Sequence, residues 1–234
     1  QGIQGVTGAT GTLPTTFEYA TFNDQGATAP DYVEGRFYYA NGSFNVYVDE
    51  PDVTLQVGEE QWVKVRNTTG VTIPNGSVVY ISGAQGQRPT VELASNTVHS
   101  TSHVVGMATH SIEHNSFGYV TLQGVVNAID TSTFTDGDDI YLGATAGSFT
   151  NVPPNAPLHR VKLGVVVNAT NNGSVLISIT DAVDINDITE VLITNPQNNE
   201  VLSYNSSIQI WENKLIQGVT GATGIQGVTG ATGI

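Results

Sequence analysis

Residues 216–234 read IQGVTGATGIQGVTGATGI, and glycine occupies every third position of this stretch. The chain opens with the same phrase, QGIQGVTGATG, at residues 1–11. The glycines in phase are Gly2, Gly5, Gly8, Gly11, Gly218, Gly221, Gly224, Gly227, Gly230 and Gly233. In a collagen triple helix, three polyproline-II chains wind about one axis where only the hydrogen atom of glycine fits. We therefore expect residues 1–12 and 216–234 to form collagen-like triple helices, which requires three copies of the chain.

A flexible linker is the alternative interpretation of a glycine-rich segment. A flexible linker requires only a glycine-rich composition. Here glycine keeps the same three-residue spacing in two separate segments, which favours the triple helix. The triplets contain neither proline nor a charged residue, so imino acids and interchain ion pairs do not support the helix. We expect another part of the chain to hold the three copies together. The phase would also continue if residue 234 were joined to residue 1, which favours end-to-end assembly into a longer fibre.

The composition excludes several classes of partner. The formal net charge is −14, and an acidic surface repels phosphate backbones, so nucleic acid is not expected as a partner. Cysteine is absent, which excludes disulfides and cysteine-based metal sites. No apolar run reaches the roughly 18 residues that cross a bilayer, so no membrane partner is expected. These features suit an extracellular or virion-surface protein.

Between the triplet segments the pattern is that of an all-β protein. Residues 36–48 contain two alternating apolar runs separated by Asn41-Gly42, the strongest short-range signal for a hairpin. From residue 61, short Val/Ile/Tyr-rich runs alternate with turn residues, and no helical period extends over three turns. A weak internal duplication relates residues 75–83 to 136–143, 103–109 to 161–167 and 118–124 to 173–179. We expect an all-β globular domain of two similar β halves plus an N-terminal hairpin, homotrimeric and flanked by collagen-like triple-helix segments.

The expected organisation has five parts. Residues 1–12 form a collagen-like segment, 13–60 an N-terminal β segment, 61–180 the duplicated β-domain, 181–215 a trimerising neck and 216–234 the second collagen-like segment. In the neck, strands over residues 201–204 and 208–211 flank the turn residues 205–207 and lead directly into the triplets. This hairpin is the predicted trimer-forming element, with Val201, Tyr204, Ile208, Ile210 and Trp211 as its contact residues.

Several phrases resemble a module of bacteriophage tail-fibre and other virion structural proteins. They are VRNTTGVTIPNGSVVYISGAQGQRPTVELA (65–94), FGYVTLQGVVNAIDTSTFTDGDDIYLGATAGSFTNVPPNAPLHRVKLGVVVN (117–168), GSVLI (173–177) and DITEVLITNPQNNEVLSYNSSIQIWEN (187–213). The resemblance implies a β-rich, trimeric, elongated virion component that alternates with collagen-like stretches. It also implies roles in adsorption or spacing and no catalysis in this module.

Motifs for catalysis or metal binding are weak. His110, Glu113 and His114 fit H-x-x-E-H, but the pattern lies between two β runs rather than on a helix, so an exposed loop is expected. Asp136, Asp138 and Asp139 are expected in a solvated turn rather than a calcium loop. A bound cation remains an alternative for the cluster of Asp181, Asp184 and Asp187. Glycoside hydrolysis needs a pair of carboxylates, and no spacing selects such a pair among Glu59, Glu60, Asp130 and Asp136. We expect no catalytic residue, no metal and no cofactor.

Two classes of function remain. The first is a structural, non-enzymatic fibre protein, whose homotrimer belongs to a virion (tail or head) fibre or to an extracellular filament of tandem units. The alternative is a receptor- or glycan-binding adhesion module displayed on a fibre, with Phe37, Tyr38 and Tyr39 as its aromatic contacts. The expected partners are two further copies of the chain and, for the alternative, a receptor or glycan of the host surface.

Overall fold

Strand β8 (Phe117–Ile129) is the longest strand of the computed structural model, which describes residues 20–181, 185 and 188–215. Its sequence, FGYVTLQGVVNAI, is rich in the β-branched and aromatic residues that favour extended backbone. Its thirteen residues pair with β4 over its first half, with β7 near its middle and with β12 over its second half. Strand β8 therefore joins two groups of strands into one nine-stranded sheet.

The first group closes into a barrel of five strands. It contains β4 (Gln61–Asn67), β5 (Val78–Gln85), β6 (Arg88–Leu93), β7 (Val104–Ala108) and the first half of β8. The pairing runs β8–β4–β6–β5–β7 and returns to β8, so the ring has no open edge. Only the β4–β6 pair within this ring is parallel.

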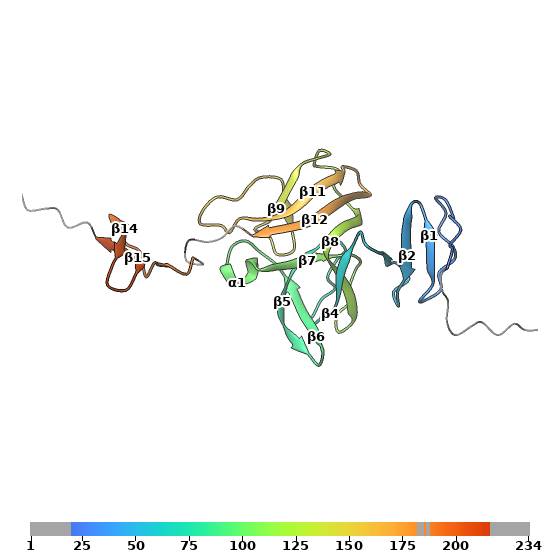
Figure 1. Ribbon diagram of the computed structural model, residues 1–234, viewed down its shortest axis with the longest axis horizontal. Helices are drawn as coiled ribbons and strands as arrows, with labels where there is room; N and C mark the ends of the chain where they lie inside the picture. The colour runs from blue at the N-terminus through green and yellow to red at the C-terminus, as the bar shows by residue number, and fades with distance from the viewer. Residues whose placement is uncertain (1–19, 182–184, 186–187, 216–234) are drawn as a thin grey trace, which may run out of the picture. The chain divides into compact units, whose positions relative to one another are not determined.

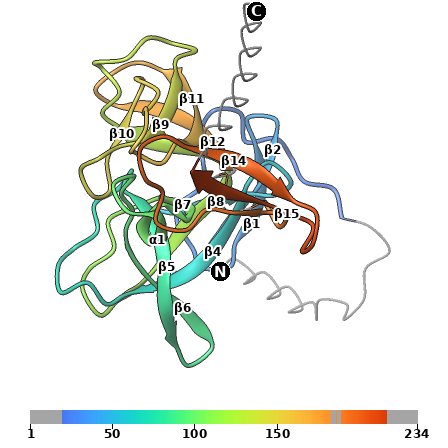
Figure 2. The same cartoon turned by 90° about the vertical axis from the view of Figure 1, so that its left-hand side faces the viewer.

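The second group extends the sheet from the other half of β8. It consists of β12 (Gly173–Asp181), β11 (Val161–Asn168), β9 (Asp139–Leu142) and β10 (Phe149–Thr150). Both views show the β5–β6 hairpin and the β9–β11 pair on opposite sides of the nine-stranded sheet (Figures 1 and 2).

The two groups share one pattern of strand pairing. The segments related by the predicted duplication fall in β5, β7 and β8 and in β9, β11 and β12. In each set the three strands pair in chain order and antiparallel. The first set is closed by β4 and β6, whereas the second stays open and ends at β10, so the halves differ in closure.

The core contains two large clusters of fully buried aliphatic side chains. Val65, Val91, Ile112 and Val120 belong to one, and Met107, Ile140, Leu163 and Ile177 belong to the other. Burial of each such side chain contributes about 1.5–3 kcal/mol, so these clusters supply the main driving force for folding.

The N-terminal hairpin is confirmed. Strands β1 (Phe37–Ala40) and β2 (Ser43–Tyr47) are antiparallel, and β3 (Thr54–Gln56) adds a third strand to their sheet. Asn41 and Gly42 have φ values of 53° and 84°, which is the left-handed backbone that a two-residue hairpin turn requires.

Over the described residues the fold is mostly β and has one α-helical turn, α1 (His99–Ser102), which the sequence patterns did not predict. A segment of four residues is too short to produce a helical period of apolar residues. In the described part of the chain, no helix is long and apolar enough to cross a membrane.

The chain divides after Asp181 into two units. Among its described residues the second unit has β13 (Val191–Leu192), β14 (Glu200–Asn205) and β15 (Ile210–Leu215), which form a three-stranded sheet with β15 in the middle. The predicted hairpin is present, but its second strand begins at Ile210 because residues 206–209 form the turn. The expected collagen-like segments, with their ten glycines, lie outside the described residues.

Candidate functional site

The sheet of the second unit carries four large apolar side chains on one face, where Glu200 and Asn213 also lie and hydrogen-bond each other. Tyr204 pairs directly with Trp211, and their ring centroids lie 5.4 Å apart. Directly paired residues share a face and side chains alternate along a strand, so Leu202 and Leu215 lie on the same face. We call Leu202, Tyr204, Trp211 and Leu215 the apolar neck face.

This face is uncovered in the single chain. Its four side chains are 41%, 51%, 42% and 55% exposed, and none of residues 188–215 is buried. A small sheet is stable in water only when a hydrophobic face packs against something. The sheet therefore lacks a core of its own.

The predicted neck residues divide between several positions. Tyr204 and Trp211 lie on the apolar neck face, whereas Val201 and Ile210 alternate onto the opposite face, and Ile208 lies in the turn. Leu202 and Leu215 were missed, although counting in steps of two from Tyr204 and Trp211 would have found them.

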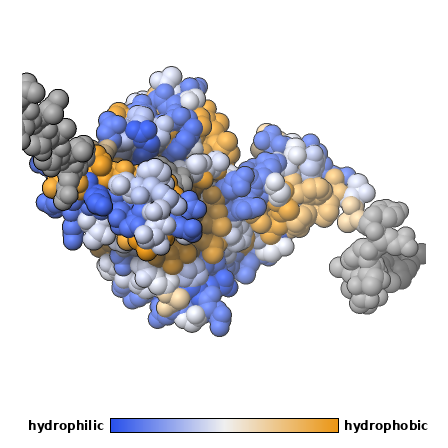
Figure 3. Space-filling view, turned by 60° about the vertical axis from the view of Figure 1, so that its left-hand side comes forward, coloured by the Kyte–Doolittle hydropathy of each residue, from blue (hydrophilic) through white to orange (hydrophobic). Residues whose placement is uncertain are grey.

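The N-terminal sheet carries a second exposed apolar area. Phe22, Phe37 and Phe44 are 37–43% exposed, and their ring centroids lie 5.4–5.6 Å apart. We call these three residues the phenylalanine patch. Figure 3 shows hydrophobic residues gathered on the lobe that contains this sheet.

The aromatic contacts predicted for an adhesion module do not form one surface. Phe37 belongs to the phenylalanine patch, Tyr38 is buried, and Tyr39 is half-buried. Successive side chains of a strand point to opposite faces, which separates Tyr38 from its two neighbours.

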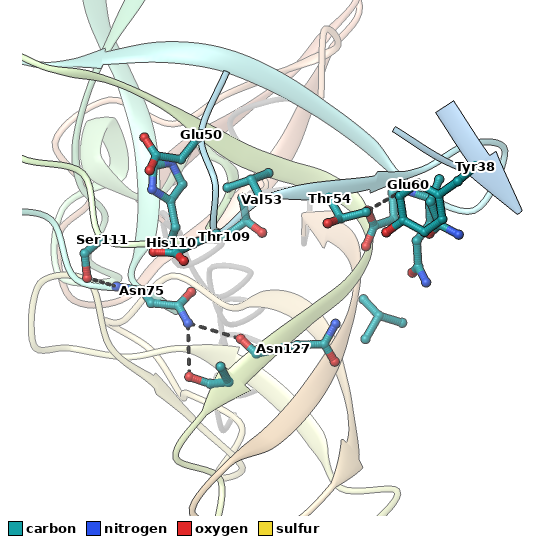
Figure 4. Close-up of a pocket in the computed structure, with 15 residues that line it drawn as sticks. Tyr38, Glu50, Val53, Thr54, Glu60, Asn75, Thr109, His110, Ser111 and Asn127 are labelled. Carbon is teal, nitrogen blue, oxygen red and sulfur yellow. Dashed lines mark hydrogen bonds between the residues drawn. The ribbon is translucent and has the colours of Figure 1, made fainter. Parts of the chain in front are cut away.

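A cavity of about 700 Å³ lies in the first unit, between the N-terminal sheet and the barrel (Figure 4). Its walls include three carboxylates, Glu50, Asp52 and Glu60, and no lysine or arginine. We call it the acidic cavity. At one end Glu50 lies beside His110, and at the other end Glu60 lies near Tyr38 (Figure 4).

His110 is buried at the edge of this cavity. Its Nε2 accepts a hydrogen bond of 3.1 Å from the backbone N–H of Tyr119, which requires an unprotonated nitrogen. Burial lowers the pKa of His110, while Glu50 and Asp52 act in the opposite direction. The imidazole is therefore held neutral.

A pH dependence of stability follows from this shift. Because the pKa of His110 is lower in the folded chain, its favourable contribution is complete above about pH 6.5 and decreases as the pH falls below that value. We expect the free energy of unfolding to fall more between pH 7.5 and 5.5 in the wild type than in His110→Gln, because only the wild type takes up an additional proton at this position on unfolding. Denaturant titrations at both pH values measure this difference. The variant of exposed His103, His103→Gln, is the control, and equal pH dependence in wild type and His110→Gln would refute the assignment.

The H-x-x-E-H residues do not converge. Glu113 accepts a hydrogen bond from the Thr72 hydroxyl (2.7 Å), and Nδ1 of His114 accepts one from the backbone N–H of Gly70 (2.9 Å). The expected exposed loop is wrong for His110, because its imidazole fills a buried position beside β8. Across the described residues, no group of three His, Cys, Asp or Glu side chains is arranged to hold a metal ion.

The aspartates of residues 136–139 also have separate partners. Asp136 accepts from the backbone N–H of Ala169, and Asp139 forms an ion pair with Lys162 at 2.7 Å. Asp138 accepts from the backbone N–H of Thr135, which closes the turn around Gly137. Asp184 and Asp187 of the other cluster lie outside the described residues.

Each of the four carboxylates weighed for glycoside hydrolysis has a hydrogen-bond partner of its own, which for Glu60 is the backbone N–H of Gln56. Glu59 accepts from the Ser43 hydroxyl, Asp130 from Ser132 and Asp136 from Ala169. Of these four residues, only Glu60 lines the acidic cavity.

Comparisons with known proteins place the first unit in a family. A family model described as phage cement protein matches residues 57–180, just over half of the chain. No curated protein matches the sequence. Among solved structures, the N base of the head fiber protein gp8.5 of bacteriophage phi29 is similar, with 17% identity and a TM-score of 0.33 over 51% of this chain and 94% of that one.

Proposed function

Because the chain belongs to the phage cement protein family and is thus a structural protein of the phage virion, we propose that it acts as a homotrimeric fibre component of the virion surface. Its cement domain attaches to the particle, and its collagen-like segments extend from that domain or connect it to the next. The family match covers residues 57–180, so the barrel and its extension are the part assigned to attachment.

The observation that carries the proposal is the uncovered sheet of the second unit. Its apolar neck face needs a partner surface, and the first glycine of the C-terminal repeat, Gly218, follows three residues after Leu215. A triple helix starting at that point brings three copies of β15 together. Three apolar neck faces can then cover one another, which supplies the association that proline-free triplets lack.

The phenylalanine patch supports the same arrangement at the other end of the chain. Phe22 follows the N-terminal triplets by about ten residues. Three chains held together over residues 1–12 would bring three patches close to one another. Contact between them would remove exposed aromatic surface, at about 25 cal/mol per Å² of apolar area.

Electron micrographs of the assembly test this function. We expect β-domains at the surface of phage particles, with thin rods of about 50 Å where the seventeen residues from Gly218 to Ile234 form a triple helix, at about 3.1 Å per residue. Domains that repeat along open filaments away from any particle would contradict the virion assignment. They would instead favour an extracellular filament.

A further inference from the structure

We propose that the acidic cavity is a binding site for a non-acidic saccharide, a neutral or amino sugar whose hydroxyl and amino groups donate hydrogen bonds to the oxygen atoms of the cavity. This adds a ligand-binding activity to the proposed structural role. Its biological use, recognition of a surface glycan, rests on the proposed virion-surface position, whereas the binding itself does not.

The size and construction of the cavity suit a small ligand. A volume of about 700 Å³ lies within the range of roughly 300–1,000 Å³ that is typical of ligand pockets. Its walls come from separate elements of the first unit, with Tyr38 and Thr54 on the N-terminal sheet and Asn75 and Thr109 on the loops of the barrel (Figure 4). Such a cavity can contact a ligand from two sides.

The charge of the lining excludes acidic ligands. Glu50, Asp52 and Glu60 contribute carboxylates, and none of the lining residues is a lysine or an arginine. His110 adds no positive charge, since burial keeps its imidazole neutral. Phosphate, sulfate and acidic sugars would meet repulsion without a compensating cation.

Asn75 provides an acceptor with a fixed direction. Its Nδ2 donates to the backbone oxygens of Asn127 (3.1 Å) and Ala128 (3.0 Å), so the orientation of the amide is determined by two acceptors. Successive carbonyls of a regular strand point in opposite directions. The left-handed φ of 58° at Ala128 interrupts this alternation at the end of β8 and lets both oxygens accept from one nitrogen.

The Oδ1 atom of Asn75 is consequently left for a ligand. It is buried and has no hydrogen-bond partner among the described residues. In Figure 4 it points away from Asn127, toward the side of the cavity where Thr109 and His110 lie. A buried acceptor without a partner is destabilising, and a small shift of the cavity wall would offer it a ligand hydroxyl.

The distribution of polar groups favours a saccharide over a metal ion or a polyamine. Glu50 and Glu60 lie at opposite ends of the cavity rather than converging on one point (Figure 4). The rest of the lining includes neutral polar groups, among them the amide of Asn75 and the hydroxyls of Thr109 and Ser111. Acceptors and hydroxyls spread over several directions match the hydroxyl groups around a sugar ring, while Val53 and Val125 offer apolar surface to its C–H groups.

The test measures binding of free sugars to the full chain by saturation-transfer NMR and titration calorimetry. The probes are glucose, galactose, glucosamine and N-acetylglucosamine, with sialic acid and spermidine as the acidic and the polyamine comparison. We expect at least one of the four non-acidic sugars to bind with a millimolar or lower Kd, and sialic acid not to bind.

Two cavity variants and one control complete the experiment. Glu60→Gln removes a carboxylate from the cavity, and Asn75→Ala removes the free acceptor; each should weaken sugar binding at least tenfold. Glu92→Gln removes the same charge from an exposed position of β6 and should leave binding unchanged. Circular dichroism checks the fold of each variant, and Glu60→Gln decides the matter if Asn75→Ala does not fold.

The proposal is overturned if no non-acidic sugar binds, if spermidine or sialic acid binds in preference, or if both cavity variants bind as the wild type does. None of these outcomes bears on the homotrimer or on the virion location. Those are measured by particle mass and by micrographs of the assembly, so failure of the saccharide site is distinguishable from failure of the proposed function.

Discussion

Replacing Tyr204 and Trp211 together by serine should convert the proposed trimer into a monomer while the first unit stays folded. In the trimer each of these side chains loses its exposed apolar surface, which is worth about 2 kcal/mol per side chain. Six such side chains in three copies give roughly 12 kcal/mol, far more than the proline-free triplets are expected to supply. Mass photometry at micromolar concentration measures the oligomeric state, and far-ultraviolet circular dichroism reports whether the β-domain persists.

The opposite face of the same sheet provides a matched control. Val201 and Ile210 alternate away from Tyr204 and Trp211, so the double serine variant of Val201 and Ile210 should remain trimeric. If the Tyr204/Trp211 variant also remains trimeric, the apolar neck face does not hold the copies together. If both double variants are monomeric, the two faces contribute alike and the assignment of one face is wrong.

Gly106→Ala should unfold the first unit or destabilise it by more than about 3 kcal/mol. A Cβ atom at this position of β7 would lie 2.3 Å from the backbone oxygen of Thr121 and 2.7 Å from a methyl carbon of Val120. The nearest atom belongs to the backbone of β8, so the contact is relieved only by moving the two strands that close the barrel. For a unit of this size the expected decrease in Tm is at least about 6 °C, measured by thermal unfolding.

The glycine of an open turn is the control for this substitution. Gly86 joins β5 to β6 with a φ of +62°, and a Cβ atom there would have no heavy atom within 4 Å. Gly86→Ala should therefore cost only the left-handed backbone penalty of about 1–2 kcal/mol. An equal cost for the two variants would show that β7 and β8 are not in close contact and that the barrel is open.

The sequence predicts the local parts of this fold well, because they depend on neighbouring residues. Asn41-Gly42 fixes the turn between β1 and β2, and the alternation around Asn205 fixes the hairpin of β14 and β15. Closure of the barrel was not predictable in the same way. The parallel pairing of β4 with β6 and the three partners of β8 depend on contacts between distant segments, which leave no periodic signal in a single strand.

The candidate sites could be predicted from the sequence to a smaller extent than the fold. The lining of the acidic cavity extends from Tyr38 to Ala128 without any characteristic spacing, and the free acceptor of Asn75 exists only because of the backbone at Ala128. His110 was expected in an exposed loop because its motif lies between two β runs rather than on a helix. In the structure its imidazole is buried beside β8, where Nε2 accepts a hydrogen bond from the backbone N–H of Tyr119, a contact between distant segments.

The mass of the unmodified chain in native solution tests the homotrimer most directly. Native mass spectrometry of the 234-residue chain should give a particle of three times 24.6 kDa that persists at micromolar concentration. A particle of 24.6 kDa with an intact β-domain would contradict the account, because the apolar neck face would then be stable in water without a partner.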